Sequence, residues 1–596
     1  MDRTGIIVVT LCAILLVFWV REQSRIAQEQ ARFAATNQVA KAQSQFTTTG
    51  SNAVSSTLNA TTTALPPVFD TNTPEELLVI TNAQARYTFT SRGGGLKSVE
   101  LLDYPETVSP RWKKKVAKDG VATLNQRAPV PVLAILGDAS LVGDGNFTLT
   151  QTADGVRAEK SLTNGLRLLK EFHLSSNYLV NASVSLENAS DLPHTLPAQE
   201  WVVGTATPMG PDDNGMNVGA MWCNGTNAVD NGMRYFNTNT TTFFGFISRT
   251  PTPEFRAGAG NVVWAAVHNQ FFALLAMPKP PAQQVVAIPV NLPPFPNVEP
   301  VPGAPALQGI QTALVYPTAT LSAHQTIERQ IIFFAGPKEY RLLARIGDQF
   351  QNQADLVMNF GKFSGFFAKA LLLAMNWLHD VTGAGYGLAI VLITVIIKVL
   401  FWPLTAASTR SMKRMQVLAP EMQALKEKYK DDMQKFTQKQ WELYRKHKVS
   451  PMSGCLPMAI QMPVFFGFYT MIRSAIELRG AHFLWIADLA KPDTLFMIPG
   501  THLPFNLLPL LMGGAMLWQS HLQPVSPGMD PAQAKMMRYM PLMFLVFMYA
   551  CSSGLTLYWT INNVLTVVQT KLTKMNQTPV SPAAVSVLTP VSKKKK

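Results

Sequence analysis

Apolar residues are unevenly distributed along the 596-residue chain. An uninterrupted apolar run covers Gly5–Val20, and several more follow Phe366, whereas the long stretch between them has the mixed composition of a globular domain. Apolar runs of this kind are typical of segments that cross a bilayer. The pattern therefore predicts a multidomain membrane protein in which one large globular domain is flanked by membrane segments.

Residues 1–22 are predicted to form an N-terminal transmembrane anchor. A signal peptide has a similar charge and apolar core, but Arg21–Arg25 follow the run without a small-x-small cleavage pattern, which favours an uncleaved anchor. Residues 23–68 are rich in Gln, Ala, Thr, Ser and Asn and lack an apolar pattern. They are predicted to form a flexible linker.

Residues 69–345 are predicted to form an all-β sandwich. Short alternating runs such as Ala85–Thr90 are broken by Gly, Pro, Asn and Asp, and Leu166–Leu186 and Thr326–Phe334 repeat the pattern. The Pro-rich stretch Pro278–Pro305 is predicted to be a long surface loop.

The C-terminal part is predicted to be helical. Residues 355–380 interleave apolar residues with Lys362, Lys369 and Asn376, which suits a helix lying in the membrane interface. Five spans are expected within residues 385–572. They are placed at Tyr386–Leu404, Leu456–Ile472, Leu503–Leu522, Tyr539–Cys551 and Leu555–Val568. With the anchor they make a six-span membrane region.

Basic residues in the short loops predict the orientation of the chain. The segment 405–450, between the second and third spans, carries eleven Lys and Arg against five acidic residues, and a basic tail covers 573–596. Both are therefore expected in the cytoplasm, with the β domain in the periplasm. The formal charge of +14 fits nucleic acid or anionic lipid, and its position beside the spans favours lipid.

The chain carries no motif for nucleotide hydrolysis or metal chemistry, so no cofactor and no catalytic residue is predicted. Only Cys223 lies in the large domain, which therefore cannot form an internal disulfide. His173, His194 and His268 lack a partner pattern and are interpreted as surface or satisfied histidines.

Lys398 is the only charged residue inside the five downstream spans as placed here. An ammonium at the centre of a span costs about 2.5–3.5 kcal/mol on insertion scales, so it is a candidate functional residue. Snorkelling towards the cytoplasmic headgroups is an equally good explanation. Thr394 lies one turn before Lys398 and extends a polar face along the helix.

Other spans also carry polar side chains. The third span contains Gln461, and the last contains Thr560, Asn562, Asn563, Thr566 and Gln569. Hydrogen bonding between helices explains most isolated polar residues in spans. A polar strip on several helices, with a cation and no carboxylate, alternatively indicates a water-filled cavity that attracts acidic groups of a visiting chain.

Residues 405–450 are predicted to form two charged amphipathic helices. An apolar stripe runs along the first, formed by Met412, Met415, Leu418, Met422 and Leu425. The stripe suits the seam of a helical hairpin. Docking of varied partners is the alternative, because Met side chains are adaptable.

Several segments resemble the YidC branch of the YidC/Oxa/Alb insertase family, in the expected order and across nearly the whole chain. They are Gly93-Gly94 within Tyr87–Leu102, Trp264–Phe272, Trp402–Thr405, Gly454–Pro463 and Ser553–Asn563. The resemblance implies an all-β supersandwich periplasmic domain and a five-helix insertase core around a hydrophilic groove, with a cytoplasmic helical hairpin. The family commonly has Arg where this chain has Lys398, which keeps the charge without the planar fork.

The resemblance implies an insertase that assists newly made inner-membrane proteins, in cooperation with the Sec translocon and ribosomes. Anionic lipids are the further predicted partner. The predicted cytoplasmic docking residues are Lys413, Arg414, Lys593, Lys594, Lys595 and Lys596. A secondary transporter of a small anionic solute is the first alternative, weakened because no inverted repeat and no intramembrane carboxylate are found. An enzyme in the β domain is the second, supported by fold analogy alone.

Overall fold

The fold was determined from a computed structural model. It describes residues 69, 72–108, 120–210, 213, 215–237, 240–242, 247–249, 251–295, 306–361, 364–430, 432–447, 449, 456–499, 503–522 and 531–575. The predicted anchor 1–22, the whole of the linker 23–68 and most of the tail 573–596 lie outside these residues. The described chain divides into a β unit within 52–361 together with 473–479, and a helical unit that contains the rest.

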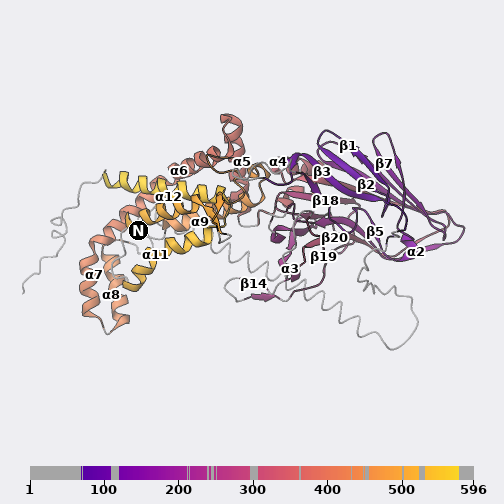
Figure 1. The fold of residues 1–596 in the computed structure, drawn as a ribbon. Helices are drawn as coiled ribbons and strands as arrows, with labels where there is room; N and C mark the ends of the chain where they lie inside the picture. The colour runs from indigo at the N-terminus through magenta and orange to yellow at the C-terminus, as the bar shows by residue number, and fades with distance from the viewer. Residues whose placement is uncertain are drawn as a thin grey trace, which may run out of the picture. The chain divides into compact units, whose positions relative to one another are not determined.

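The β unit is built from three main sheets of antiparallel strands (Figure 1). The largest has, in spatial order, β13 (Ala228–Gly232), β12 (Gly219–Cys223), β17 (Trp264–His268), β18 (Phe272–Lys279), β22 (Thr326–Pro337), β9 (Leu179–Asn188), β8 (Leu166–Leu174), β7 (Gly155–Ser161) and β6 (Thr148–Gln151). The second has β16 (Phe255–Ala257), β19 (Gln284–Asn291), β20 (Gln308–Tyr316), β11 (Gln199–Ala206) and β5 (Ile135–Leu136). The third has β1 (Leu77–Thr81), β2 (Ala85–Thr90), β3 (Gly95–Pro105) and β4 (Val121–Leu124).

Smaller elements complete the β unit. Two short antiparallel pairs are β10 (His194–Leu196) with β21 (Ala319–Leu321), and β14 (Thr240–Thr242) with β15 (Ile247–Arg249). The helices are α2 (Ala139–Val142), η1 (Gly215–Asn217), α3 (Arg234–Asn237), α4 (Tyr340–Phe350) and η2 (Ala354–Met358). The all-β prediction for this region is confirmed.

Sheet faces packed against one another form the core of the β unit. The five-stranded and nine-stranded sheets meet where β11 and β20 contact β17, and the buried indoles of Trp201 and Trp264 lie on these strands. The four-stranded sheet packs on the other part of the large sheet, where the rings of Phe89 and Phe172 lie 5.0 Å apart. Burial of such large rings is the main source of stability in this kind of sandwich.

Strand alternation places one charged side chain in this core. Along β8, Leu166, Leu168 and Phe172 point inward, and Lys170 shares their face and is fully buried. Its ammonium donates hydrogen bonds of 2.7 Å to the carbonyl oxygens of Gly93 and Leu133. Burial lowers the pKa of Lys170 to about 7.

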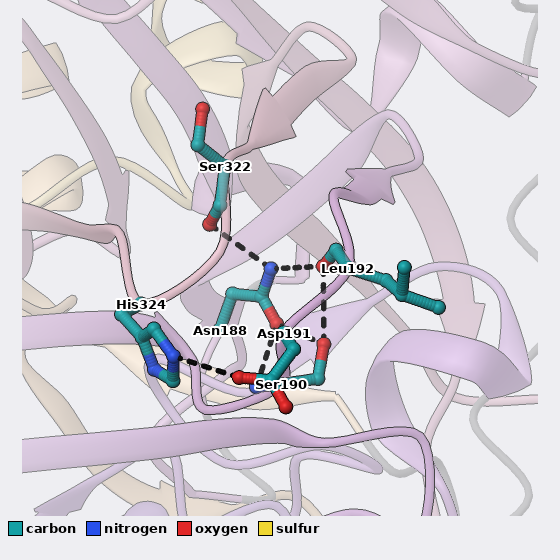
Figure 2. Close-up of polar contacts among 6 residues, drawn as sticks. All are labelled: Asn188, Ser190, Asp191, Leu192, Ser322 and His324. Carbon is teal, nitrogen blue, oxygen red and sulfur yellow. Dashed lines mark hydrogen bonds and ion pairs between the residues drawn. The ribbon is translucent and has the colours of Figure 1, made fainter.

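A buried amide closes the turn that follows β9 (Figure 2). The Asn188 side chain donates hydrogen bonds to the carbonyl oxygens of Leu192, at 2.8 Å, and of Ser322, at 3.0 Å. His324 and Asp191 contact one another at 3.1 Å on the surface beside it. The amide therefore ties the end of β9 to the segment that leads into β22.

The prediction of a loop over Pro278–Pro305 is wrong in part. Strand β19, Gln284–Asn291, runs through this stretch and pairs with β20. Pro289 is tolerated because β16 pairs with β19 only from Val285 to Ala287, so the proline lies where that edge of the strand is open.

The helical unit contains eight helices in its described residues. They are α5 (Gly365–Thr382), α6 (Tyr386–Val417), α7 (Ala419–Lys428), α8 (Met433–Lys446), α9 (Leu456–Ser474), α10 (Leu507–Leu522), α11 (Pro531–Met548) and α12 (Ser553–Met575). The pair β23 (Thr494–Met497) with β24 (Pro504–Asn506) lies between α9 and α10, and the 3₁₀ turn η4 (Ile476–Leu478) belongs to the β unit. Helices form at all five predicted span positions.

Three helix boundaries differ from the prediction. The interfacial helix begins at Gly365 and not near residue 355, because Asn359 and Gly361 adopt the left-handed backbone that ends helices. The second span continues through Pro403 to Val417, so the first part of the predicted hairpin belongs to the span helix. The short fifth span begins at Pro531, not at residue 539.

Length and composition distinguish one helix of the described part. Only Tyr386–Val417 is both long and apolar enough to cross a membrane on these criteria, and Tyr539–Met548 is a shorter apolar helix segment. Helix α10 has 16 residues, which corresponds to a rise of about 24 Å.

The apolar stripe of the hairpin forms a seam. Met415, Leu418 and Met422 are buried against Leu443 and Tyr444 of α8. Helices α7 and α8 lie side by side (Figure 1). The described stripe residues at its centre are therefore used for packing within the hairpin.

Candidate functional site

Helix α6 has an apolar exposed side and a more polar, covered side. Val395, Ile396, Val399 and Leu400 are exposed, as expected for contact with acyl chains. Lys398 lies between these residues in sequence but points towards α12, which packs along α6 (Figure 1). The cation is thus directed between helices.

Two polar contacts join α6 to α12. The Lys398 ammonium donates a hydrogen bond of 2.8 Å to the hydroxyl of Thr566. Seven residues further along α6, the hydroxyl of Thr405 accepts a hydrogen bond from the Gln569 amide. Residues spaced by seven share a helix face, so the two contacts follow one seam. In the part of the chain that the structure describes, no carboxylate forms an ion pair with Lys398.

Two predicted groove residues are satisfied by their own helices. The hydroxyl of Thr394 donates to the carbonyl oxygen of Ile390 at 2.6 Å, and that of Thr560 donates to Thr556 at 2.7 Å. Both side chains are buried. Such back-bonding is the usual way for a threonine to be accommodated in a membrane helix.

Helices α9 and α12 meet through a polar contact surrounded by aromatic rings. The Gln461 amide donates to the hydroxyl of Tyr558, whose ring stacks on Phe468 with centroids 4.1 Å apart. Trp559 lies 4.9 Å from Phe465 of α9. The ring of Phe544 on α11 lies at the same distance from Trp559, 4.9 Å between centroids, so three helices converge on this indole.

Asn562 and Asn563 are both buried on α12. The backbone carbonyl of Asn562 accepts a hydrogen bond of 2.7 Å from Thr566. The Nδ2 atom of Asn563 is enclosed and has no acceptor among the described residues, and the same holds for the indole Nε1 of Trp559. These are two unsatisfied neutral donors one helical turn apart.

Large apolar side chains are exposed on α9 and α11 beside this cluster. On α9 they are Met462, Phe466 and Tyr469. On α11 they include Leu542, Met543, Val546 and Phe547. Exposed apolar area of this extent is typical of a lipid or protein contact surface.

The structure brings the predicted site residues together in pairs and not as one continuous strip. Lys398 meets Thr566, whereas Gln461 and Gln569 meet Tyr558 and Thr405, which were not predicted. Thr405 could have been found from its spacing of seven from Lys398. Tyr558 and Trp559 carried no comparable signal, because aromatic residues are common in apolar helices.

The predicted docking residues are only partly described. Arg414 is exposed near the end of α6, and the side chain of Lys413 and the residues Lys593–Lys596 lie outside the described part. Among the described residues, no group of three or more His, Cys, Asp or Glu side chains is arranged to hold a metal ion.

Comparisons with known proteins agree with this architecture of a β unit followed by membrane helices. Residues 77–374 match the model of the YidC periplasmic domain, and residues 377–579 match that of the 60Kd inner membrane protein. The membrane protein insertase YidC of Citrifermentans bemidjiense is 31% identical over 503 residues, which cover 81% of this chain and 82% of that protein. The protein of the same name from Syntrophus aciditrophicus is 29% identical over 533 residues, 86% of this chain and 87% of that protein.

A solved structure also matches over most of the chain. It is an active YidC insertase crystal structure with the first transmembrane domain resolved, and it is 19% identical, covers 83% of this chain and 92% of that chain, and has a TM-score of 0.32. The sequence relationships define a membrane protein with a periplasmic β domain. The chain belongs to the YidC family of membrane protein insertases.

Proposed function

We propose that this chain assists the insertion, folding and assembly of newly synthesised inner-membrane proteins. The observation that carries the proposal is Lys398, an ammonium held between α6 and α12 with a hydroxyl and not a carboxylate as its partner. Membership of a family whose relatives are named membrane protein insertases supports it.

The insertase mechanism follows from the two kinds of surface. An incoming apolar segment contacts the exposed side chains of α9 and α11, and its burial in lipid supplies most of the driving force. Its polar flank rests beside Lys398, which attracts acidic groups, and beside the polar side chains of α9 and α12. Contact with polar groups lowers the cost of desolvating that flank.

The proposed topology has six spans, with both termini in the cytoplasm and the β unit in the periplasm. The Sec translocon, ribosomes and anionic lipids are the proposed partners, through the basic hairpin and tail. The basic residues beside the spans support this arrangement.

Lys398→Ala in proteoliposomes tests the proposal. We expect insertion of clients with acidic translocated tails to fall about fivefold, the equivalent of about 1 kcal/mol for a partly hydrated charge pair. Lys398→Arg should remain active, and a client with a neutral tail is the matched control. Normal insertion of acidic clients by Lys398→Ala would show that Lys398 only snorkels.

The transporter alternative predicts a different result in the same vesicles. Accumulation of a small anionic solute, with no insertion of any client, would favour it over the insertase.

A further inference from the structure

Two buried donors of α12 have no role in the contacts described above. Asn563 is 4% exposed, and within the part of the chain that the structure describes neither its Nδ2 nor the Nε1 of Trp559 has an acceptor. Buried donors without acceptors are rare and costly, most of all in a membrane, where water does not replace the lost bond. Two such donors close together indicate a binding site for a ligand that supplies acceptors.

The chemistry of the pair defines what can bind. Both groups are neutral N–H donors, so the complementary atom is an uncharged acceptor and not a carboxylate, which Lys398 attracts more strongly. In a polypeptide entering lipid, the backbone carbonyl oxygen is the most frequent acceptor and the most expensive one to leave unpaired.

The geometry fits a polypeptide backbone. Trp559 and Asn563 are separated by four residues, which places their Cβ atoms about 6 Å apart on one side of α12. Carbonyl groups on one side of an extended chain repeat at about 6.6 Å. Two alternate carbonyl groups of an incoming segment therefore match the pair.

The surrounding helices have points at which they can bend. Trp559 is covered by Phe465 of α9 and Phe544 of α11. Each of the two helices has a proline within one turn of its phenylalanine, Pro463 in α9 and Pro541 in α11. A proline removes one hydrogen bond from the helix ladder and is a common site of bending. Access to the two donors thus requires movement of helices that are already weakened at this level.

We propose that Trp559 and Asn563 form a binding site for backbone carbonyl oxygens of client segments that have not completed their helical hydrogen bonds. The inference rests on the proposed insertase function and names the part of the client that α12 recognises. Lys398 then binds acidic side chains of the client, and the donor pair binds carbonyl oxygens of its backbone.

The test compares two neutral-tailed, single-span clients that differ at one position of the entering segment, proline or alanine. Proline leaves the carbonyl four residues earlier without its donor. We expect the variant Trp559→Phe/Asn563→Leu to insert the proline client about fivefold less than the wild type, and the alanine client nearly as well, from the usual contribution of a single hydrogen bond. Val564→Ala, at a lipid-facing position of α12, is the matched control.

The outcomes separate the two proposals. Equal losses for both clients, or no loss, would overturn the carbonyl site and indicate that the donors hold water or serve packing alone. Failure of the wild type to insert either client would instead refute the proposed function.

A second measurement uses the wild-type chain and so does not depend on the folding of the double variant. An isotope-labelled carbonyl placed four residues before the client's proline is followed by its infrared amide I band. We expect the band to shift to lower frequency when the client is crosslinked to the chain. A band identical to that of the client in lipid alone would overturn the proposal.

Discussion

Substitution of Lys170 by methionine tests how a buried charge affects the stability of the β unit. The ammonium is fully buried, donates to the carbonyl oxygens of Gly93 and Leu133, and lies 4.6 Å from the ring centroid of Phe147. Burial lowers its pKa from the usual 10.5 to about 7. The folded state therefore releases this proton at a lower pH than the unfolded chain does.

The sign of the pH dependence follows from this difference. Between pH 7 and 10.5 the unfolded chain binds more protons at Lys170 than the folded state does, so the free energy of unfolding rises with pH. The full shift corresponds to about 5 kcal/mol, of which about 2 kcal/mol falls between about pH 7 and about pH 9. Burial lowers the pKa of Lys338 to about 8, so Lys338 also makes the free energy of unfolding rise with pH. The Lys170 variant retains this contribution, which therefore cancels in the comparison with the wild type.

Lys170→Met removes the titrating group and leaves two carbonyl oxygens without this donor. Each unpaired carbonyl costs about 1–3 kcal/mol. At about pH 9 the variant should show this loss in full, whereas at about pH 7 the removal of a buried charge offsets much of it. The difference in stability between wild type and variant should thus grow by about 2 kcal/mol over this range.

Urea titration of the full chain, read by a short protease pulse that digests the unfolded β unit, measures this difference. Tyr87 and Tyr316 do not titrate below pH 9, because burial raises the pKa of each to about 12. Lys279→Met, on the exposed end of β18, controls for the loss of a lysine. An equal loss of stability at both pH values would refute the linkage of Lys170 to folding.

Two further predictions concern the helical hairpin and the basic tail. Met422→Ala should lower the stability of the hairpin by about 2–5 kcal/mol because Met422 is buried in the seam. Hydrogen exchange of the amides in 433–446 measures this loss, and Met433→Ala, at a side chain 73% exposed, is the control. Equal exchange rates in the two variants would contradict the seam. Reversing the charges of Lys593–Lys596 should weaken co-sedimentation with ribosomes. The effect should be larger at low salt, because high salt screens exposed charges. Unchanged co-sedimentation at every salt concentration would exclude a role of the tail in ribosome binding.

The fold could be predicted where local patterns and tertiary structure agree. Alternation along Leu166–Leu186 predicted β8 and β9, and the apolar runs predicted the positions of α6, α9, α10, α11 and α12. Differences arose where a single residue carried misleading information. The Pro-rich stretch suggested a loop, but its Pro289 lies at an open strand edge, and the predicted end of the second span at Leu404 lies inside a continuous helix.

The site could be predicted only at the level of residues on one helix. Spacing placed Thr394 with Lys398, because residues four apart on a helix share a face. The contacts of Lys398 with Thr566 and of Gln461 with Tyr558 join residues far apart in sequence, so no spacing rule reaches them.

Three kinds of polar side chain in the helical unit look alike in the sequence. Thr394 and Thr560 donate their hydroxyl protons to their own helices, so they cannot donate to a client without losing that bond, although the hydroxyl oxygen can still accept one. Lys398 gives one hydrogen bond to Thr566, and an ammonium has three donors. Asn563 has a donor for which the described residues supply no acceptor. Acceptor groups of a client that bind at Lys398 or Asn563 add hydrogen bonds without first breaking others, so these positions, and not the whole polar strip, should dominate the affinity for such acceptors.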